Sequence, residues 1–199
     1  MRAAKRVIDA VRTLREGVAD RSVVVALDGH SGAGKSTLAT EVADTIDAAV
    51  VHVDDFYRDL RDSERLALTA EQGVDRYFDW ERLRAEAIMP LARLTTARFG
   101  RFDWVKGHGL TTPVSVRPRA VVLVEGVYAA RPEFDASLDL KVLVEVSSAT
   151  RHARLRQRAR TVSRDNVELW DGRWHSAECH YFRVIRPRKT FDLVVRGDD

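Results

Sequence analysis

The feature that most constrains this chain is a glycine-rich loop between an apolar run and a helical pattern. Residues 29–36 read GHSGAGKS and match the pattern G-x-x-x-x-G-K-[ST] in full. Residues 22–28 (SVVVALD) are almost continuously apolar, which is typical of a buried parallel strand. Glycines let backbone N–H groups close around phosphate oxygens, and the following helix adds partial positive charge at its N-terminus. The sequence therefore predicts a strand, a phosphate cradle and a helix over 35–46.

We expect this loop to hold a nucleoside triphosphate with Mg²⁺. Lys35 would reach the β- and γ-phosphates, and the Ser36 hydroxyl would hold the metal ion. His30 is expected to be a solvated loop residue. No guanine-specific N-K-x-D motif is present, which disfavours a GTP switch. The residues assigned to nucleotide binding are Gly29, Ser31, Gly32, Ala33, Gly34, Lys35, Ser36 and Thr37.

The rest of the chain alternates between strand and helix patterns, which predicts an α/β fold with a parallel sheet. We expect a single domain over 1–199, with an insertion at about 56–118 and a lid at about 151–170. Pro90 predicts a kink or break inside its helix. The expected strands are 22–28, 49–54, 119–125, 139–146 and 190–195, and the expected helices are 3–16, 35–46, 64–72, 81–95, 149–160 and 170–183.

Three acidic residues stand at the predicted strand ends. Asp54 and Asp55 stand at the end of the second strand, and Glu125 ends the third. Because the carboxyl ends of parallel strands face the ligand crevice, a carboxylate there can accept a proton or hold Mg²⁺. The pattern does not decide between Asp54 and Asp55, and Glu125 could also be a strand-end residue without a role. Ser36, Asp54 and Glu125 are the candidate metal ligands.

Arginines dominate the basic residues and gather in one segment. Of the 33 basic residues, five are lysine and 28 are arginine. A lid of arginines could clamp a triphosphate and neutralise the charge that develops during transfer. The alternatives are a solvated basic face or a nucleic-acid patch. The segment contains Arg151, Arg154, Arg156, Arg158, Arg160 and Arg164, of which Arg151, Arg154 and Arg158 share one helical face.

Composition excludes several classes of protein. Hydrophobic residues make up 45% of the chain, enough for a full core, but no apolar run approaches membrane-spanning length. One cysteine, Cys179, cannot form an internal disulfide or a zinc cluster. The first residues lack the apolar stretch of a secretory signal, so we expect a cytoplasmic protein. The net charge of +3 does not demand nucleic acid as a partner.

Taken in order along the chain, these motifs resemble the uridine kinase and phosphoribulokinase branch of P-loop kinases. The resemblance implies a three-layer α/β/α P-loop fold with five parallel strands in the order 2-3-1-4-5 and an arginine-rich lid. It rests on the loop at 29–36, Asp54-Asp55-Phe56-Tyr57, Phe78-Asp79, residues 122–126, the arginine helix, and Pro187 with the closing FDLVV at 191–195.

The resemblance also implies roles for individual residues. Asp54 would be the general base for the acceptor hydroxyl, Tyr57 would line the acceptor pocket, and Asp79 would bind sugar hydroxyls. The phosphates would be contacted by Arg154, Arg158 and Arg164, with Lys35, Arg154 and Arg158 acting in catalysis. Phe102 and Glu125 complete the expected acceptor site, and residues 187–189 lie where the adenine would bind. Trp80-Glu81 and Phe102-Asp103-Trp104 depart from the uridine kinase pattern, so the kinase class carries over better than the uridine specificity.

The expected function is therefore ATP- and Mg²⁺-dependent phosphoryl transfer to a hydroxyl of a small molecule. A nucleoside of the uridine or cytidine kind, or a related ribosyl compound, is the favoured acceptor. One alternative is a nucleoside monophosphate kinase, for which Arg58, Arg61 and Arg76 could face the acceptor phosphate. The other is a nucleotide-binding regulator or nucleic-acid-associated ATPase. We expect no membrane or nucleic-acid partner, and the oligomeric state stays open.

Overall fold

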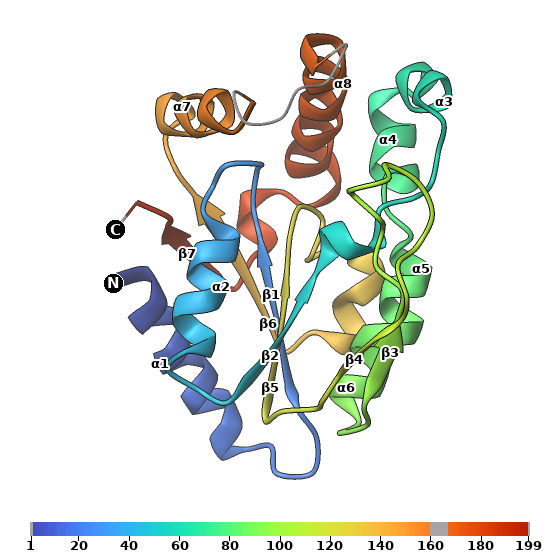
Figure 1. The fold of residues 1–199 in the computed structure, drawn as a ribbon. Helices are drawn as coiled ribbons and strands as arrows, with labels where there is room; N and C mark the ends of the chain where they lie inside the picture. Colours follow the sequence, from blue (N-terminus) through green and yellow to red (C-terminus); the bar gives the residue numbers. More distant parts are fainter. Residues whose placement is uncertain (1, 160–166, 199) are drawn as a thin grey trace.

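The computed structural model describes residues 2–159 and 167–198, and they form a central parallel sheet with helices on both faces (Figure 1). The sheet order is β2-β5-β1-β6-β7, with every neighbouring pair parallel. Counted among the parallel strands alone, this is the predicted order 2-3-1-4-5; the labels differ because β3 and β4 pair separately. The strands are β1 (Val23–Asp28), β2 (Ala48–His52), β5 (Val121–Glu125), β6 (Leu140–Glu145) and β7 (Leu193–Arg196).

Alternate residues of the central strand β1 belong to two separate hydrophobic cores, one on each face of the sheet. Val23, Val25 and Leu27 of β1 pack with α1 (Arg2–Glu16) and α2 (Lys35–Ala43) on one face. Val24 and Ala26 point to the other face, where the helices of the insertion cover the sheet. All six residues of β1 are buried, as the continuous apolar run predicts. The three-layer α/β/α architecture is thus confirmed.

The insertion supplies the outer wall of the second core. The predicted helix over 64–72 is in fact two helices, because Thr69 caps a new helix by accepting a hydrogen bond from the Gln72 N–H at 3.2 Å. The predicted distortion at Pro90 takes the form of a π-helical turn over Arg84–Ile88. The elements are α3 (Asp62–Ala67), α4 (Ala70–Arg76), α5 (Trp80–Leu83), α6 (Met89–Ala92) and the antiparallel hairpin of β3 (Ala97–Phe99) and β4 (Val114–Val116).

Helices α7 (Ser148–Ala159) and α8 (Val167–His180) stand over the carboxyl end of the sheet at the top of Figure 1. Helix α8 continues into a π-helical turn over Tyr181–Ile185. Part of the predicted lid, residues 160–166, lies outside the described residues. Within the described ranges, no helix combines the length and apolar character needed to cross a membrane.

The strand boundaries differ from the sequence prediction by at most three residues, and two of the differences have a clear structural cause. Strand β2 ends at His52, because Val53–Phe56 form a three-ten turn that carries Asp54 and Asp55 beyond the sheet. Strand β7 begins at Leu193 rather than at 190, because Arg188–Thr190 form another three-ten turn. A further three-ten turn, Pro132–Ser137, joins β5 to β6. Because of the turn after β2, Asp54 and Asp55 both lie above the carboxyl edge of the sheet.

Candidate functional site

The loop between β1 and α2 has the backbone conformation that its glycines predict. Gly29, Gly32 and Gly34 have φ values of 150°, 79° and 96°, in the region that side chains disfavour. A Cβ on Gly29 would lie 2.3 Å from the Val144 carbonyl oxygen of β6. Helix α2 begins at Lys35, directly after Gly34. The loop is therefore a cradle that ends at a helix N-terminus, a natural site for phosphate.

The Lys35 ammonium is folded back over this cradle. Its Nζ donates hydrogen bonds to the carbonyl oxygens of Gly29, at 2.8 Å, and His30, at 3.0 Å. The Lys35 side chain is buried, with 7% of the residue exposed. Because an ammonium carries three N–H donors, these two bonds leave one donor for an anion.

Ser36, Glu125 and His52 form a chain of hydrogen bonds at the carboxyl edge of the sheet. The Ser36 hydroxyl lies 3.1 Å from each carboxylate oxygen of Glu125. His52 Nδ1 lies 2.5 Å from Glu125 Oε1, and this hydrogen bond raises the pKa of His52 although burial opposes it. Glu125 is buried and ends β5, as predicted, whereas His52 was not identified from the sequence.

The oxygen donors here suit Mg²⁺. A serine hydroxyl that donates its proton to Glu125 turns its lone pairs outward, and Mg²⁺ prefers hydroxyl, carboxylate and water oxygens. Ser36 would hold the ion beside the phosphates, and Glu125 would orient Ser36 or a bound water. Asp54, the third candidate ligand, is exposed on the three-ten turn after β2. Within the described part of the chain, no cluster of three or more His, Cys, Asp or Glu side chains is arranged to hold a metal ion.

Asp28, the last residue of β1, anchors the base of the loop and was not identified from the sequence. Its carboxylate accepts hydrogen bonds from the N–H groups of Gly29 at 2.7 Å, Tyr128 at 3.0 Å and Ala130 at 3.0 Å. The Tyr181 hydroxyl donates a fourth at 2.8 Å. Complete burial raises the pKa of Asp28, opposed by these donors. The aspartate thereby ties the phosphate loop to the segment after β5.

Helix α7 packs directly on the cradle through the arginines that share one face. Arg154 donates to the Gly32 carbonyl at 3.1 Å and to the Gly197 carbonyl at 3.2 Å. The Arg151 side chain lies so close to Gly32 that a Cβ added to this glycine would be 3.2 Å from Arg151 Cγ. The side chain of Arg158 and the whole of Arg164, two expected phosphate contacts, lie outside the described residues. Arg151 and Arg154 therefore lie beside the loop, and their action as a lid on the phosphates stays a prediction.

The two acceptor motifs meet through backbone hydrogen bonds. The Asp79 N–H donates to the Phe56 carbonyl at 2.8 Å, and the Arg58 N–H donates to the Tyr77 carbonyl at 2.9 Å. The Asp79 side chain caps α5 by accepting from the Arg82 N–H at 3.2 Å. Asp55, the other carboxylate of the first motif, lies 3.1 Å from Arg101 Nε. Segments about 20 residues apart in sequence thus form one wall.

Aromatic rings fill the space behind this wall. The buried Tyr57 ring lies 5.2 Å from Phe102, 5.0 Å from Trp104 and 5.5 Å from Phe78, measured between ring centroids. Phe102 itself is buried with only 3% exposed, whereas Trp104 is 42% exposed. The structure thus brings Tyr57 and Phe102 together, and Trp104 is the ring of this group that faces outward.

Helix α8 contributes two residues that the sequence analysis did not assign. The Glu178 carboxylate accepts a hydrogen bond from the Ser31 N–H at 3.1 Å and contacts the Ser31 hydroxyl. It also lies 2.9 Å from His30 Nδ1, and Trp174 Nε1 donates to it at 2.5 Å. The prediction of a solvated His30 is therefore wrong, because α8 packs over the loop. Ser31, assigned to phosphate, directs its N–H to Glu178.

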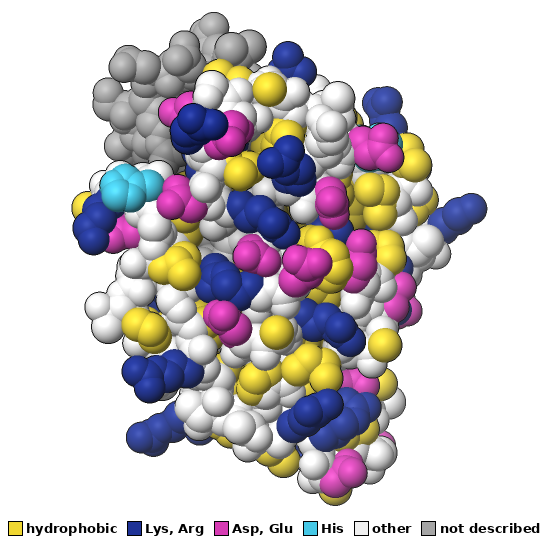
Figure 2. Space-filling view, turned by 90° about the vertical axis from the view of Figure 1, so that its right-hand side faces the viewer, with side chains coloured by type: hydrophobic (Ala, Val, Ile, Leu, Met, Phe, Trp, Pro, Cys, Tyr) yellow, Lys and Arg dark blue, Asp and Glu magenta, His cyan; other side chains and the backbone are white. Residues whose placement is uncertain are grey.

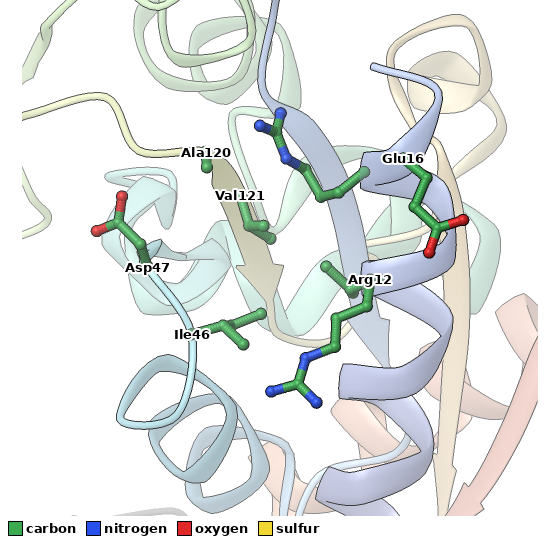
Figure 3. Close-up of a pocket in the computed structure, with 8 residues that line it drawn as sticks. Arg12, Glu16, Ile46, Asp47, Ala120 and Val121 are labelled. Atoms are coloured by element: carbon green, nitrogen blue, oxygen red, sulfur yellow. The ribbon is translucent and has the colours of Figure 1, made fainter. Parts of the chain in front are cut away.

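A separate cavity of about 380 Å³ lies at the end of the sheet opposite to the phosphate loop (Figure 3). Arg12 and Glu16 of α1 line it together with Asp47, which precedes β2, and Val121, which begins β5. The phosphate loop follows the carboxyl end of β1, so this cavity lies at the amino ends of the strands. It is remote from the loop and from the acceptor motifs.

Comparison with known proteins groups the chain with small-molecule kinases. A uridine kinase from Halobacterium salinarum is 30% identical over 153 residues, covering 74% of this chain and 64% of that protein. A uridine kinase from Clostridium botulinum is 27% identical over 178 residues, covering 84% of this chain and 80% of that one. The chain thus spans just under two thirds of the length of the Halobacterium relative. No protein-family profile matches it.

Solved structures share the fold. A protein from Bacillus stearothermophilus described as a "possible uridine kinase" superposes with a TM-score of 0.67 at 20% identity, covering 95% of this chain and 98% of that one. Phosphoribulokinase from Rhodobacter spheroides superposes with a TM-score of 0.61 at 14% identity, covering 89% of this chain and 71% of that one. At these identities the likeness establishes the fold.

Proposed function

The chain belongs to the uridine kinase and phosphoribulokinase-like family of P-loop kinases, and we propose that it transfers the γ-phosphoryl group of ATP to a hydroxyl of a small, unphosphorylated molecule. One observation carries this proposal. The phosphate loop and the paired motifs at Asp54–Tyr57 and Phe78–Asp79 lie at the same edge of one sheet. The proposed donor and acceptor sites are therefore adjacent, as in-line transfer requires.

On the donor side, this chain's residues hold and neutralise the phosphates. The cradle N–H groups and the third donor of Lys35 would bind the polyphosphate, with Arg154 beside them at Gly32. Ser36 and Glu125 would hold Mg²⁺, which neutralises charge that develops on the phosphate oxygens. Residues 187–189 would lie along the adenine.

On the acceptor side, Asp54 would act as the general base. It is an exposed carboxylate on the turn that follows β2, at the edge where the loop lies. A carboxylate in this place can orient the acceptor hydroxyl and take its proton as the new O–P bond forms. Asp55 is a poorer candidate because it is only partly exposed, whereas Asp54 is exposed. Asp79 and Tyr57 would bind the body of the acceptor.

The ion pairs of the insertion favour an acceptor without a phosphate. Arg58 lies 3.8 Å from Asp79 and 3.6 Å from Glu81, and Arg61 lies 3.2 Å from Glu64. Of the three arginines considered for a monophosphate kinase, these two already have carboxylate partners. Figure 2 shows that basic and acidic side chains are interspersed over the face of the molecule that the insertion forms. A second phosphate would need arginines that carboxylates do not already neutralise.

The aromatic rings support a nucleoside or related ribosyl compound as the acceptor. Trp104 presents a partly exposed ring beside Tyr57, and such a face can stack on a planar base. Asp79 would then accept hydrogen bonds from ribose hydroxyls. The alternative of a nucleic-acid-associated ATPase is less favoured, because Arg151 and Arg154 direct their side chains at the loop and α8 rather than at solvent.

The proposal is tested by measuring ADP formation with Mg²⁺ and ATP in the presence of nucleosides or their monophosphates. A nucleoside should stimulate turnover far more than its monophosphate. Asp54→Asn should lower kcat by about 100-fold or more, as expected for the loss of a general base. Asp9→Asn, which alters an exposed carboxylate of α1, is the matched control and should leave kcat unchanged. Full activity of Asp54→Asn would exclude the mechanism.

A further inference from the structure

One face of α8 and the turn after it carries three side chains that all reach the phosphate loop. Trp174, Glu178 and Tyr181 stand at positions i, i+4 and i+7, which share one side of a helix. Trp174 Nε1 donates to the Ser31 hydroxyl at 2.9 Å, and Tyr181 donates to Asp28 at the base of the loop. Glu178 lies between them and is fully buried. None of the three is needed by the transfer mechanism described above.

Hydrogen-bond donors from three elements converge on the Glu178 carboxylate. Three come from the loop: His30 Nδ1, the Ser31 N–H and the Ser31 hydroxyl. One comes from Trp174, and Arg151 Nη1 of α7 lies 3.5 Å away. Burial opposes ionisation, but the hydrogen bonds with His30 and Ser31 and the charge of Lys35 hold the pKa of Glu178 below its usual range. Glu178 is therefore a carboxylate kept charged beside a loop that binds anions.

The peptide unit between His30 and Ser31 links this carboxylate to Lys35. Its N–H group, on Ser31, donates to Glu178 at 3.1 Å, and its carbonyl group, on His30, accepts from Lys35 Nζ at 3.0 Å. All peptide bonds in the part of the chain that the structure describes are trans. In a trans peptide the N–H and C=O bonds point in opposite directions. A group that fixes the N–H direction therefore also fixes the direction of the His30 carbonyl. This carbonyl is one of the two oxygens that hold Lys35 Nζ, and it also accepts from the Ala33 N–H at 3.1 Å.

We propose that Glu178 is a positioning residue that sets the Lys35 ammonium for the β- and γ-phosphates through the His30–Ser31 peptide. The inference rests on the proposed function only for the identity of those phosphates as the ligand of Lys35. A corollary is that the Ser31 N–H stays on Glu178 when nucleotide binds. The phosphate cradle is then formed by the amides that follow Ser31, apart from that of Ala33, which donates to the His30 carbonyl at 3.1 Å.

The charge of Glu178 provides a way to separate this role from others. A carboxylate beside a polyphosphate repels it, so loss of the charge alone would strengthen nucleotide binding. Loss of the hydrogen-bond acceptor would release the His30–Ser31 peptide and so weaken nucleotide binding. Glu178→Gln removes the charge but keeps an oxygen that can accept from the Ser31 N–H, whereas Glu178→Met has a similar length and no comparable acceptor. Glu178→Gln should therefore bind nucleotide about as tightly as the wild type or slightly more tightly, whereas Glu178→Met should bind it more weakly.

The experiment measures the affinities of ATP, ADP and AMP for the wild type and these variants. Glu178→Met should bind ATP and ADP about tenfold more weakly, the effect of about one hydrogen bond, and AMP nearly normally, because AMP lacks the phosphates that Lys35 reaches. Glu178→Gln should stay within about threefold of the wild type for all three nucleotides. In a Lys35→Met background, Glu178→Met should cause no further loss, since both act on the same contact.

Two outcomes would overturn the inference. Equal weakening of all three nucleotides by Glu178→Met, with a lower melting temperature, would mean that Glu178 only anchors α8. If Glu178→Met binds ATP as tightly as the wild type or more tightly, the carboxylate merely repels the nucleotide. Glu133→Gln, which removes a carboxylate from the buried Arg131 elsewhere, controls for general destabilisation. These binding measurements need no acceptor, so they stand or fall independently of phosphoryl transfer.

If Glu178→Met does not fold, the wild type answers the question. On addition of Mg²⁺ and ADP, the backbone amide resonance of Ser31 should move less than those of Gly32 and Gly34, because its N–H remains on Glu178. A Ser31 shift as large as theirs would show that its amide turns to the phosphates and would overturn the inference.

Discussion

The Tyr181 hydroxyl donates a hydrogen bond to the buried Asp28 carboxylate at 2.8 Å, joining the turn after α8 to the strand that precedes the phosphate loop. The same carboxylate holds the Gly29 N–H at 2.7 Å, so the first residue of the loop depends on this contact. The helix over the site and the loop beneath it are therefore one hydrogen-bonded unit. Substitutions on this face of α8 and the turn after it should therefore change the affinity for nucleotide.

Tyr181→Phe tests this connection. The substitution leaves a buried carboxylate short of one donor, so the free energy of unfolding should fall by about 1–3 kcal/mol. ATP affinity should fall with it, because Gly29 is held less firmly. The matched control is Tyr128→Phe, since the buried Tyr128 hydroxyl has no hydrogen-bond partner among the described residues. Urea unfolding of both variants checks the prediction; equal stabilities would contradict it.

The backbone of the loop leaves no room for a side chain at its first glycine. Gly29→Ala would place a Cβ 2.3 Å from the Val144 carbonyl oxygen and force an alanine to a φ of 150°. We expect the variant to lose several kcal/mol of stability or to fail to bind ATP. Gly172→Ala is the contrasting change, because its Cβ meets no heavy atom within 4 Å in helix α8. It should stabilise the protein by up to about 1 kcal/mol, and thermal unfolding distinguishes the two.

His52 gives the stability a defined dependence on pH. The hydrogen bond to Glu125 raises the pKa of His52 above its ordinary value of 6.5, and burial opposes this. A histidine with a raised pKa stabilises the fold fully below about 6.5, and this contribution is lost as pH rises through the folded-state pKa. The wild type should exceed His52→Gln in stability by more at about pH 6 than at about pH 8.5. A difference that does not change with pH would contradict the assignment.

Local motifs accounted for the parts of the site that are contiguous in sequence. The loop at 29–36 follows a buried strand as its pattern requires, and the motifs at Asp54–Tyr57 and Phe78–Asp79 lie side by side. Thr69 with Gln72 also formed a recognisable capping signature, which the sequence analysis overlooked in predicting one helix over 64–72.

The residues that were missed depend on which elements pack together. Asp28 was taken as the end of a strand, and only the fold brings Tyr128, Ala130 and Tyr181 to it. Glu178 shares a helical face with Trp174, but helical spacing does not reveal that this face covers the loop. His30 was expected to be solvated for the same reason. Long-range packing, rather than local pattern, decides these positions.

The most direct test of the central claim follows the label from γ-labelled ATP in the presence of Mg²⁺ and a set of nucleosides, nucleoside monophosphates and other ribosyl compounds. The account predicts that label appears on a nucleoside or related ribosyl alcohol, at a rate that the corresponding monophosphate does not match. Label transferred only to monophosphates, or released only as inorganic phosphate with every acceptor tested, would contradict it.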